Sequence, residues 1–432
     1  MKRVGNLWDS LTSTETAYRA IVLGTENKRC SYEVRRRFGY QDADPLHIGV
    51  LNPDKCRKEA EKFRGFLLKG WRPSPLTTRH ISPPGQKARD LGIPTLNDHI
   101  IGWMIIETIR PIIQHGMYEH SYGSIPGRGI DAARKTVERW VQHDKKSKYF
   151  VKLDIHRFYA NIDHDIIMER FRRVIKDDKV LEVIAKAVNM APKGVPIGAY
   201  PSQWFGNFYL TVLDHYITQQ LYKTRRGKRT NYARHYLRYM DDMLLIGSSK
   251  SDLAKAIRAI SKYCQNELKL EIKHCWEIKK LDEYPVDIIG YRFYQDHTEM
   301  RGNIFLHTAR LARKIRKNLE ERNEVLVQDA RGMIALHSWC EKSDCKFFMK
   351  KYIIGTVNIK FMMEVISYAD KNQLVGNAAC VYCNTGGQQG NYHILHGHSR
   401  GSVHWRKPVV HTLRGNCVDD YTQLDFWTFI PD

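Results

Sequence analysis

The chain has 432 residues, enough for a large core and more than one subdomain. With 42% hydrophobic and 27% charged residues, it has the composition of a globular protein. Lys and Arg outnumber Asp and Glu by 69 to 47, which favours a nucleic-acid partner. The longest apolar stretch, residues 100–113, is too short for a membrane span, the first residues lack a secretory signal, and the nine cysteines have no framework spacing. These features argue against a membrane or secreted protein and predict a cytoplasmic location.

In chain order, residues 1–150 have mostly helical patterns and predict one hairpin near residues 80–94. Residues 151–297 alternate strand and helix patterns, which predicts a mixed α/β (α+β) region. Within it, Asp163 is well placed to cap a helix over residues 165–174.

Residues 298–360 have helical patterns, with a predicted core of four aromatic side chains: Trp339, Phe347, Phe348 and Tyr352. Basic residues recur there at helical spacing, four of them on one broad face: Arg310, Arg313, Lys314, Arg316 and Lys317. Such a face can follow the phosphates of a duplex, although an ordinary solvated helix has the same pattern. A second basic region, residues 28–37, could hold structured RNA.

The last segment, residues 361–432, differs in character from the rest. It contains Cys380 and Cys383, one half of a possible zinc site, followed by donors that compete for the other half: His393, His396, His398 and Cys417. Because no second pair has clean spacing, a small aromatic appendage with buried thiols and RNA-facing histidines is the competing interpretation.

Two adjacent aspartates, Asp241 and Asp242, interrupt the hydrophobic run of residues 238–247. Carboxylates in the middle of such a run are costly unless another charge neutralises them. The pattern predicts a β-hairpin with carboxylates at its tip and a divalent metal as the compensating charge. An ordinary Asp-rich turn is the alternative, since Asp is common in turns.

A third aspartate, Asp154, ends the strand-like run of residues 150–153 and has no capping role of its own. Asp154 and Asp241 together predict a site for two Mg²⁺ ions about 3.5–4 Å apart, the arrangement that serves in-line phosphoryl transfer. One ion would activate a primer 3′-hydroxyl, and both would stabilise charge on the transferring phosphate. Carboxylates suit Mg²⁺, which keeps several waters and takes few protein ligands.

Six segments, in the right order, resemble sequence blocks of the reverse transcriptases. Residues 239–242 are similar to the catalytic hairpin of that family and residues 153–154 to its first metal-binding strand. The other four resemble a fingers segment, a fingers–palm block, the nucleotide-binding turn and the primer-grip hairpin: residues 87–94, 121–129, 194–203 and 287–291. The resemblance extends over about residues 60–355 and includes the bacterial enzymes of diversity-generating retroelements, retrons and antiviral defence.

The resemblance implies a right-hand polymerase fold with RNA-directed DNA polymerase activity. It divides the chain into four parts: an N-terminal segment and fingers (1–150), a palm whose antiparallel sheet carries the carboxylates (151–297), a helical thumb (298–360) and a C-terminal extension of unknown function (361–432).

The resemblance also implies residue roles. Asp154 and Asp241 are the expected metal ligands, with Asp242 as an adjacent and often less critical carboxylate. Contacts to the incoming nucleotide are expected from nine residues: Lys87, Arg89, Ile155, Tyr159, Ile197, Gly198, Ser202, Gln203 and Lys273. Contacts to nucleic acid are expected from seven others: Tyr239, Met240, Gly290, Arg310, Arg313, Lys314 and Lys317. Lys87 also fits a loose surface charge, and Lys273 fits a solvated strand-end lysine as well as a proton donor to pyrophosphate.

Tyr159 follows Asp154 by five residues, which is the steric-gate position of the family. A bulky ring there would clash with a ribose 2′-hydroxyl and select deoxynucleotides, because this hydroxyl distinguishes RNA from DNA. The alternative is plain core packing, which fits its neighbour Phe158 better.

The nucleotide-binding turn departs from the common pattern of the family, since Ile197 replaces a Gln and Gln203 replaces a Pro. This form resembles the enzymes of diversity-generating retroelements, which copy a template RNA with errors at adenines. Losing a polar contact costs about 1–3 kcal/mol, enough to loosen discrimination between correct and wrong pairs. We therefore predict reduced fidelity; a local packing variant is the alternative.

Two biological settings fit an RNA-directed DNA polymerase of this kind. A diversity-generating retroelement implies a template RNA and an accessory protein; an antiviral defence enzyme copies its own noncoding RNA. Either way the expected partners are structured RNA, an RNA–DNA hybrid and deoxynucleotides. A non-catalytic RNA-binding scaffold is the alternative of another class, and it has no need of buried carboxylates.

Overall fold

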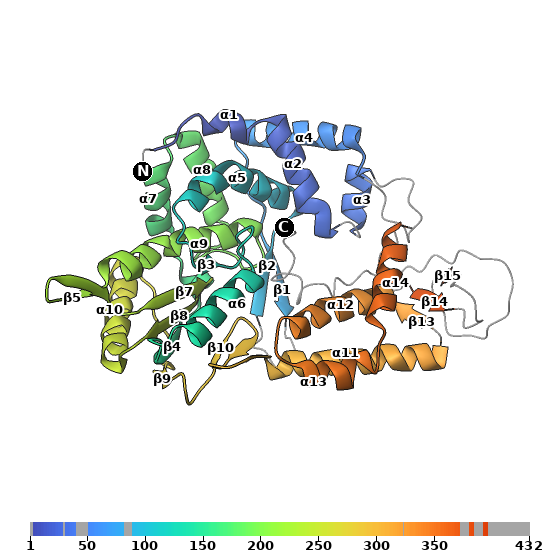
Figure 1. The fold of residues 1–432 in the computed structure, drawn as a ribbon. Coiled ribbons are helices and arrows are strands. Elements are labelled where there is room, and N and C mark those ends of the chain that lie inside the picture. Colours follow the sequence, from blue (N-terminus) through green and yellow to red (C-terminus); the bar gives the residue numbers. More distant parts are fainter. Residues whose placement is uncertain are drawn as a thin grey trace. The chain divides into compact units, whose positions relative to one another are not determined.

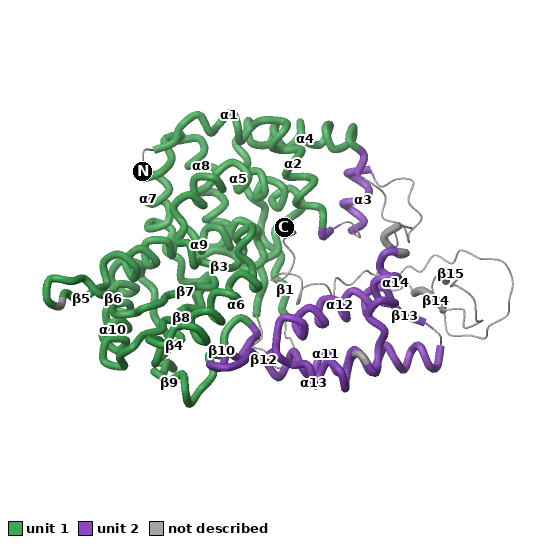
Figure 2. Tube along the Cα trace, viewed as in Figure 1, with its two compact units in different colours: residues 1–26, 53–289, 420–432 green, residues 27–52, 290–419 purple. Residues whose placement is uncertain are grey.

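The computed structural model describes residues 3–28, 31–39, 51–81, 89–322, 324–371, 380–383 and 392–395. The chain divides into two compact units. The first takes in residues 1–26 and 53–289, and the second takes in residues 27–52 and 290–419 (Figure 2).

A five-stranded sheet lies at the centre of the first unit (Figure 1). Its order is β3-β7-β8-β4-β9, from β3 (Ser121–Tyr122), β4 (Tyr149–Asp154), β7 (His235–Tyr239), β8 (Asp242–Gly247) and β9 (Lys279–Lys280). Strands β7 and β8 form an antiparallel hairpin, and β4 pairs antiparallel with β8, so the predicted antiparallel arrangement is confirmed for the strands that carry the carboxylates. The short edge strand β3 pairs parallel with β7. Central strands of this kind are buried on both faces, and Val151, Leu244 and Leu245 are fully buried.

Helices surround this sheet. Their bounds are α1 (Leu7–Leu11), α2 (Thr14–Thr25), α4 (Pro53–Leu68), α5 (Leu96–His115), α6 (Ile130–Glu138), α7 (His164–Val174), α8 (Asp178–Val188), α9 (Tyr200–His215) and α10 (Lys250–Leu268). Helix α10 packs on β8 and β4, and α9 packs on α5. The predicted cap of α7 is confirmed, because the Asp163 side chain accepts hydrogen bonds from the backbone N–H groups of Asp165 and Ile166 at 3.1 and 3.0 Å.

Two further hairpins belong to the first unit. Strands β1 (Thr77–Ile81) and β2 (Arg89–Ile93) pair antiparallel, which confirms the hairpin predicted near residues 80–94. Strands β5 (Tyr222–Arg225) and β6 (Lys228–Asn231) form a separate two-stranded sheet. Strand β10 (Val286–Ile288) ends the unit.

The second unit is mainly helical, as the pattern over residues 298–360 predicts. Its elements are α3 (Tyr32–Phe38), β11 (Tyr291–Phe293), β12 (Thr298–Met300), α11 (Gly302–Arg322), β13 (Glu324–Leu326), α12 (Val327–Glu341), α13 (Lys346–Phe348), η5 (Met349–Ile354), α14 (Ile359–Lys371), β14 (Cys380–Cys383) and β15 (Tyr392–Leu395). Phe348 is buried against Phe305, with ring centroids 3.8 Å apart. The prediction that Phe347 joins this core is wrong: its side chain is 77% exposed, because α13 turns its neighbour Phe348 inward instead.

No helix in the described part of the chain is long and apolar enough to cross a membrane. Helix α5, the most apolar by sequence, is instead a core helix with eleven buried residues.

Candidate active site

Three carboxylates meet at one end of the central sheet. The β7–β8 hairpin turns at Met240 and Asp241, as the sequence predicts, and the register of β4 places Asp154 directly opposite Asp242. Directly opposed residues of antiparallel strands are neighbours on the same face of a sheet. Acidic groups that are far apart in the sequence are therefore brought together by the sheet itself.

Asp154 has one satisfied and one unsatisfied oxygen. Its Oδ2 accepts a 2.5 Å hydrogen bond from the Lys273 ammonium. Lys273 is held there because its own N–H donates to the Asp154 carbonyl at 2.8 Å, in a short strand-like extension of β4 in which Ile155 bridges Ile272. Asp154 Oδ1 is buried and has no hydrogen-bond partner among the described residues. A buried carboxylate oxygen without a donor is a suitable ligand for a cation.

The carboxylates also act on one another at Asp241. Burial, and then the nearby charges of Asp242 and Asp154, raise the pKa of Asp241 to about 6. A backbone hydrogen bond and the charge of the Lys273 ammonium oppose this rise. A hard divalent cation bound by oxygen ligands would offset the repulsion between the three carboxylates. Asp154 and Asp241, with Asp242 beside them, thus fit Mg²⁺.

The raised pKa of Asp241 gives a testable link between pH and stability. The ordinary pKa is 3.8, so between that pH and about 6 the folded chain keeps a proton that the unfolded chain has released. This contribution to stability is complete below pH 3.8 and is lost as the pH rises through 6, at a cost of about 3 kcal/mol. The Asp241→Asn variant lacks this titration. We therefore expect its free energy of unfolding, measured by urea unfolding, to rise relative to that of the metal-free wild type by this amount between about pH 4 and pH 7. Added Mg²⁺ is expected to close the gap, and a gap independent of pH would contradict the assignment.

A buried polar network lies directly under the turn and was not predicted from the sequence. The Arg238 guanidinium forms a bidentate pair with Asp214, at 2.8 and 2.7 Å, and both side chains are fully buried. A third Arg238 nitrogen donates to the Met240 carbonyl oxygen and to Asn207 Oδ1, each at 2.9 Å. Tyr236 completes the network by donating its hydroxyl to Asp214 at 2.8 Å. The network therefore bonds to the backbone of the turn that presents Asp241.

The turn needs this support because its backbone is strained. Met240 has φ +56°, in the left-handed region that side chains with a Cβ rarely adopt. Its side chain is buried between Asn207 and Gly123, and a Cβ at Gly123 would lie 3.0 Å from Met240 Cγ. Asn207 Nδ2 also donates to the Gly123 carbonyl at 3.0 Å. The Met240 side chain is therefore packed into the core, and the contact of Met240 with nucleic acid stays a prediction.

Tyr159 lies beside the carboxylates, on the short helix η3 (Phe158–Asn161) that follows β4. Burial and the charge of Asp241 raise its pKa well above the ordinary value, which puts the hydroxyl within electrostatic reach of Asp241. Its neighbour Phe158 is fully packed, as predicted, and the two rings lie against Gly206 of α9, where a Cβ would be 2.9 Å from Phe158. A Cβ at Gly194 would collide with the Tyr159 carbonyl, which accepts a 2.8 Å hydrogen bond from Val195.

The predicted nucleotide-binding turn is bonded to the β1–β2 hairpin. The Ile197 carbonyl accepts a 2.9 Å hydrogen bond from the N–H of Gly92. Gly198 has φ +115°, and a Cβ there would lie 3.1 Å from the Gly92 carbonyl oxygen. Ile197 and Gln203 are partly exposed, whereas Ser202 is buried at the start of α9. The backbone of the turn, together with Ile197 and Gln203, is therefore the part available to a nucleotide.

The remaining predicted nucleotide contacts differ in their surroundings. Arg89 is exposed at the start of β2. Ile155 is 1% exposed in its bridge to Ile272, so its side chain is packed in the core, and its contact with the nucleotide stays a prediction. Lys87 lies outside the described residues.

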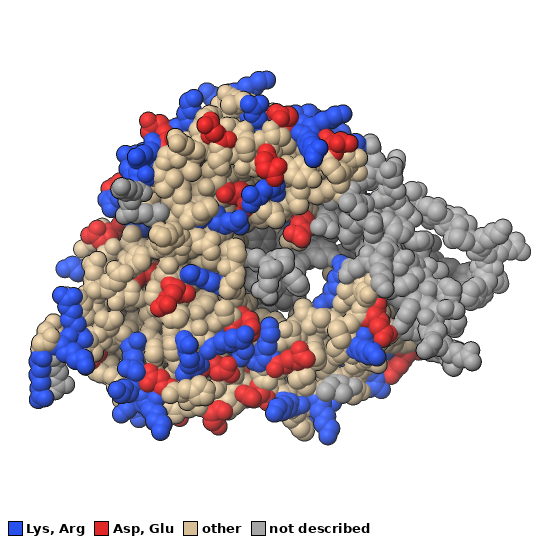
Figure 3. All heavy atoms as spheres, turned by 45° about the horizontal axis from the view of Figure 1, so that its top comes forward, with Lys and Arg blue, Asp and Glu red and all other residues tan. Residues whose placement is uncertain are grey.

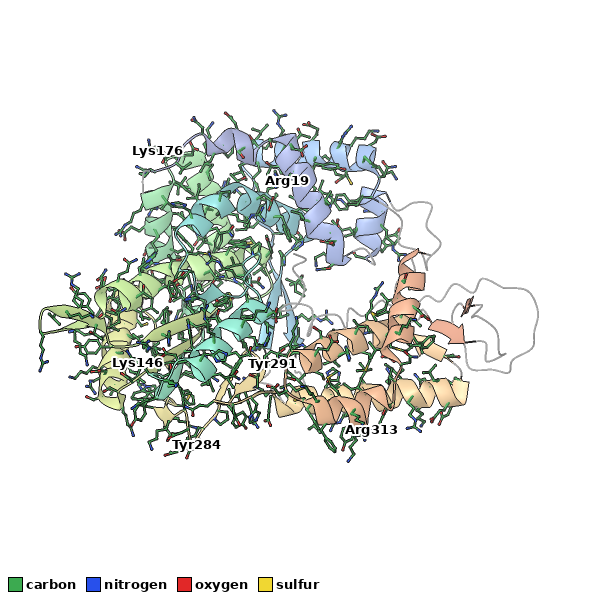
Figure 4. All side chains as sticks on the ribbon, viewed as in Figure 1. Arg19, Lys146, Lys176, Tyr284, Tyr291 and Arg313 are labelled. Carbon is green, nitrogen blue, oxygen red and sulfur yellow. The ribbon has the colours of Figure 1, made fainter. Side chains whose placement is uncertain are left out.

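The residues predicted to grip nucleic acid lie in both units. Tyr239 is partly exposed at the end of β7. In the second unit, Gly290 has φ +87° and packs on Trp339. On α11, Lys314 is paired with Asp329 at 2.9 Å and Lys317 with Glu321 at 3.7 Å. Arg310 and Arg313 have no ion-pair partner within the described part of the chain, and Figure 4 shows Arg313 extending outward from α11.

The zinc prediction stays untested. Cys380 and Cys383 begin and end strand β14, whose side chains are not among those described, and the competing donors His396, His398 and Cys417 lie outside the described residues. His393 lies in β15.

Residues 81–292 match the family model "Reverse transcriptase (RNA-dependent DNA polymerase)". Protein YkfC of Escherichia coli K12 is 25% identical over 46% of this chain and 61% of its own length. The group II intron-encoded protein LtrA of Lactococcus lactis is 23% identical over 56% of this chain and 51% of its own length. The retron Ec73 reverse transcriptase of Escherichia coli is 25% identical over 48% of this chain and 67% of its own length.

Among solved structures, apo telomerase from Candida tropicalis superposes with a TM-score of 0.44 and 12% identity, covering 70% of this chain and 59% of that chain. The chain spans only about half to two thirds of the curated relatives that it matches. The matched segment nevertheless contains Asp154, Asp241 and Asp242 together with both predicted nucleotide-binding elements. The chain therefore belongs to the bacterial reverse transcriptases and has their right-hand polymerase fold.

Proposed function

We propose that this protein is an RNA-directed DNA polymerase that copies a dedicated RNA with low fidelity. The observation that carries the proposal is the meeting of Asp154, Asp241 and Asp242 at one end of the sheet. One buried oxygen of Asp154 has no hydrogen-bond partner among the described residues, and the pKa of Asp241 is raised. A non-catalytic scaffold has no use for such a costly group of charges. In this proposal residues 1–150 form the N-terminal segment and fingers, 151–297 the palm, 298–360 the thumb and 361–432 an extension.

The chain's own residues suggest how the reaction is organised. Asp154 and Asp241 would hold two Mg²⁺ ions, which supply an activated 3′-hydroxyl and neutralise the transferring phosphate. Lys273 lies 2.5 Å from Asp154 and can add positive charge, or a proton, next to the leaving pyrophosphate. Arg89 is exposed beside the turn that carries Ile197 and can bind the triphosphate through paired donors.

The first test is sequencing of nucleic acid that co-purifies with the wild type and with the Asp241→Ala/Asp242→Ala variant. We expect deoxynucleotide product that maps to one bound RNA in the wild type, and the same RNA without product in the variant. RNA in both proteins, with no DNA in either and none made on adding Mg²⁺ and deoxynucleotides, would instead support the scaffold.

Tyr159 is proposed to exclude ribonucleotides. The ring lies against Gly206, and the Tyr159 backbone is bonded to Val195 of the Gly194 turn, so a smaller side chain would leave space for a 2′-hydroxyl without moving the backbone. We expect Tyr159→Val to lower the preference for deoxynucleotides, measured as the ratio of kcat/KM values, by roughly tenfold or more. Tyr159→Phe keeps the bulk and is the matched control. Equal preference in Tyr159→Val and the wild type would contradict this role.

Ile197 is proposed to lower fidelity, which favours the diversity-generating setting. Its backbone is bonded to Gly92, so the side chain can be changed while the turn stays in place. We expect Ile197→Gln to reduce errors opposite template adenines by roughly fivefold to a hundredfold, the equivalent of about 1–3 kcal/mol. An error spectrum from deep sequencing of the product checks this, with Ile197→Val as the control. Accurate product from the wild type would instead favour a defence enzyme that copies its own noncoding RNA.

A further inference from the structure

The β5–β6 hairpin is a basic projection on the first unit that the polymerase reaction does not use. Figure 1 shows it extending from the body beside α10, and Figure 3 shows Lys and Arg side chains gathered at this projection. From Lys223 to Arg229 the sequence has five basic residues and no acidic residue. Arg226, Lys228 and Arg229 are exposed.

The hairpin lies at the far end of the sheet from the carboxylates. The chain leaves β6 and enters β7 at Arg234, whose N–H donates to the Ile246 carbonyl at 2.8 Å. Ile246 and Gly247 end the strand that begins at Asp242. Five steps of about 3.4 Å separate Asp242 from Gly247, so the base of the hairpin is roughly 17 Å from the carboxylates. Its charges are too far away to touch the reacting nucleotide.

The turn of the hairpin is unfavourable for the free protein. The two-residue turn has φ +51° at Arg226 and +72° at Gly227, a geometry for which Asn or Gly is preferred at the first position. An arginine kept in a strained turn, among like charges, indicates a function for the charge.

The hairpin is nevertheless held in place at its base. Lys223 is ion-paired with Asp252 of α10, and Asn231 Nδ2 donates to the Thr218 carbonyl at 3.1 Å. The Arg229 guanidinium lies 4.6 Å above the Tyr222 ring. Arg226 and Lys228 have no such partner within the described residues, so the tip presents two free cations on an anchored support.

The chemistry of the hairpin selects the class of partner. Its exposed side chains are basic or are small polar groups such as Thr224, Thr230 and Asn231, and it contributes no large exposed apolar side chain. Protein interfaces need buried apolar or aromatic anchors, whereas phosphates are bound by cations and hydroxyl or amide donors. We propose that the β5–β6 hairpin binds the phosphates of a structured part of the RNA, outside the duplex at the carboxylates. This inference rests on the proposed copying of a dedicated RNA.

The test uses the full-length protein with two matched variants. Arg226→Asn/Lys228→Thr removes both free cations with residues that suit the turn and the strand. Arg172→Gln/Lys176→Gln removes two exposed cations elsewhere in the first unit; Figure 4 shows Lys176 on its outer rim. The probe is the RNA that co-purifies with the wild type, identified by sequencing and transcribed in vitro. Its affinity for each protein is measured across a range of salt concentrations.

We expect the hairpin variant to bind this RNA about tenfold more weakly than the wild type at 0.15 M salt. Its slope of log affinity against log salt is expected to be shallower by about 1.4–1.8, because each lost phosphate contact removes about 0.7 on a single strand and about 0.9 on a duplex. The control variant is expected to stay within about twofold of the wild type. Equal weakening of both variants, unchanged binding by the hairpin variant, or a wild type that purifies without RNA would overturn the inference. Polymerase activity is measured separately, as the extension of a poly(rA)/oligo(dT) duplex. A wild type that binds the RNA but extends no primer would overturn the proposed function and leave this inference standing.

Discussion

Asp241→Asn is expected to abolish DNA synthesis, with kcat on poly(rA)/oligo(dT) falling by roughly a thousandfold or more. The substitution removes the charge of a proposed metal ligand and keeps its shape. Metal ions supply several kcal/mol of stabilisation to the transferring phosphate, and each factor of ten in rate is worth about 1.4 kcal/mol. Steady-state kinetics at saturating Mg²⁺ is the measurement.

Asp242→Asn is the matched control for this prediction. Asp242 is the first residue of β8 and lies opposite Asp154, so the two variants change neighbouring carboxylates of one hairpin. We expect a smaller loss of kcat in Asp242→Asn than in Asp241→Asn, and folded protein in both, as judged by circular dichroism. A fully active Asp241→Asn variant would remove the basis of the proposed function.

Features set by local sequence were predictable. The cap at Asp163 and the hairpin around Asp241 depend on residues within a few positions of one another. The local pattern of polar and apolar residues therefore predicts both. The meeting of Asp154 with the hairpin is a long-range contact. It was predicted because both aspartates interrupt apolar strand-like runs, and the resemblance of the sequence blocks to a known family supported it.

Features set by side-chain packing could not be predicted from the sequence. Met240 and Ile155 are each next to a predicted metal ligand, yet both side chains face the core. The strained turn directs Met240 inward, and Ile155 faces inward because successive side chains of a strand point to opposite faces. Asp214 lies 24 residues before Arg238 on α9, and no periodic pattern connects a lone helix aspartate to a strand arginine. A charged residue in the middle of an otherwise apolar strand was the available signal, since a buried arginine requires a buried partner.

The Arg238–Asp214 pair gives the second large prediction, which concerns stability. Both side chains are fully buried. Arg238→Met would remove the charged partner of the Asp214 carboxylate and leave it the hydrogen bond from the Tyr236 hydroxyl. We expect this variant to lose about 3–5 kcal/mol of unfolding free energy, the usual cost of leaving a buried charge unpaired. Urea unfolding measures the loss, which is a large fraction of the stability of an ordinary domain.

The double variant Arg238→Met/Asp214→Leu keeps this prediction testable. Removing both charges avoids the unpaired carboxylate, so we expect the double variant to be at least about 2 kcal/mol more stable than Arg238→Met alone. A double-mutant cycle with Asp214→Leu measures this coupling. Additive losses would contradict the pairing.

The same double variant separates stability from the positioning of Asp241. Without Arg238, the Met240 carbonyl loses the 2.9 Å hydrogen bond that supports the strained turn. One hydrogen bond contributes about 1 kcal/mol, so we expect the turn to hold the cation less well and the Mg²⁺ dissociation constant, measured by calorimetry, to rise roughly fivefold to tenfold. Asn207→Leu removes a neutral member of the network and is expected to shift Mg²⁺ binding in the same direction while the Arg238–Asp214 pair remains intact. If the double variant is folded and binds Mg²⁺ like the wild type, the network serves stability alone, and the strain at Met240 is held by the packing of Gly123 against it.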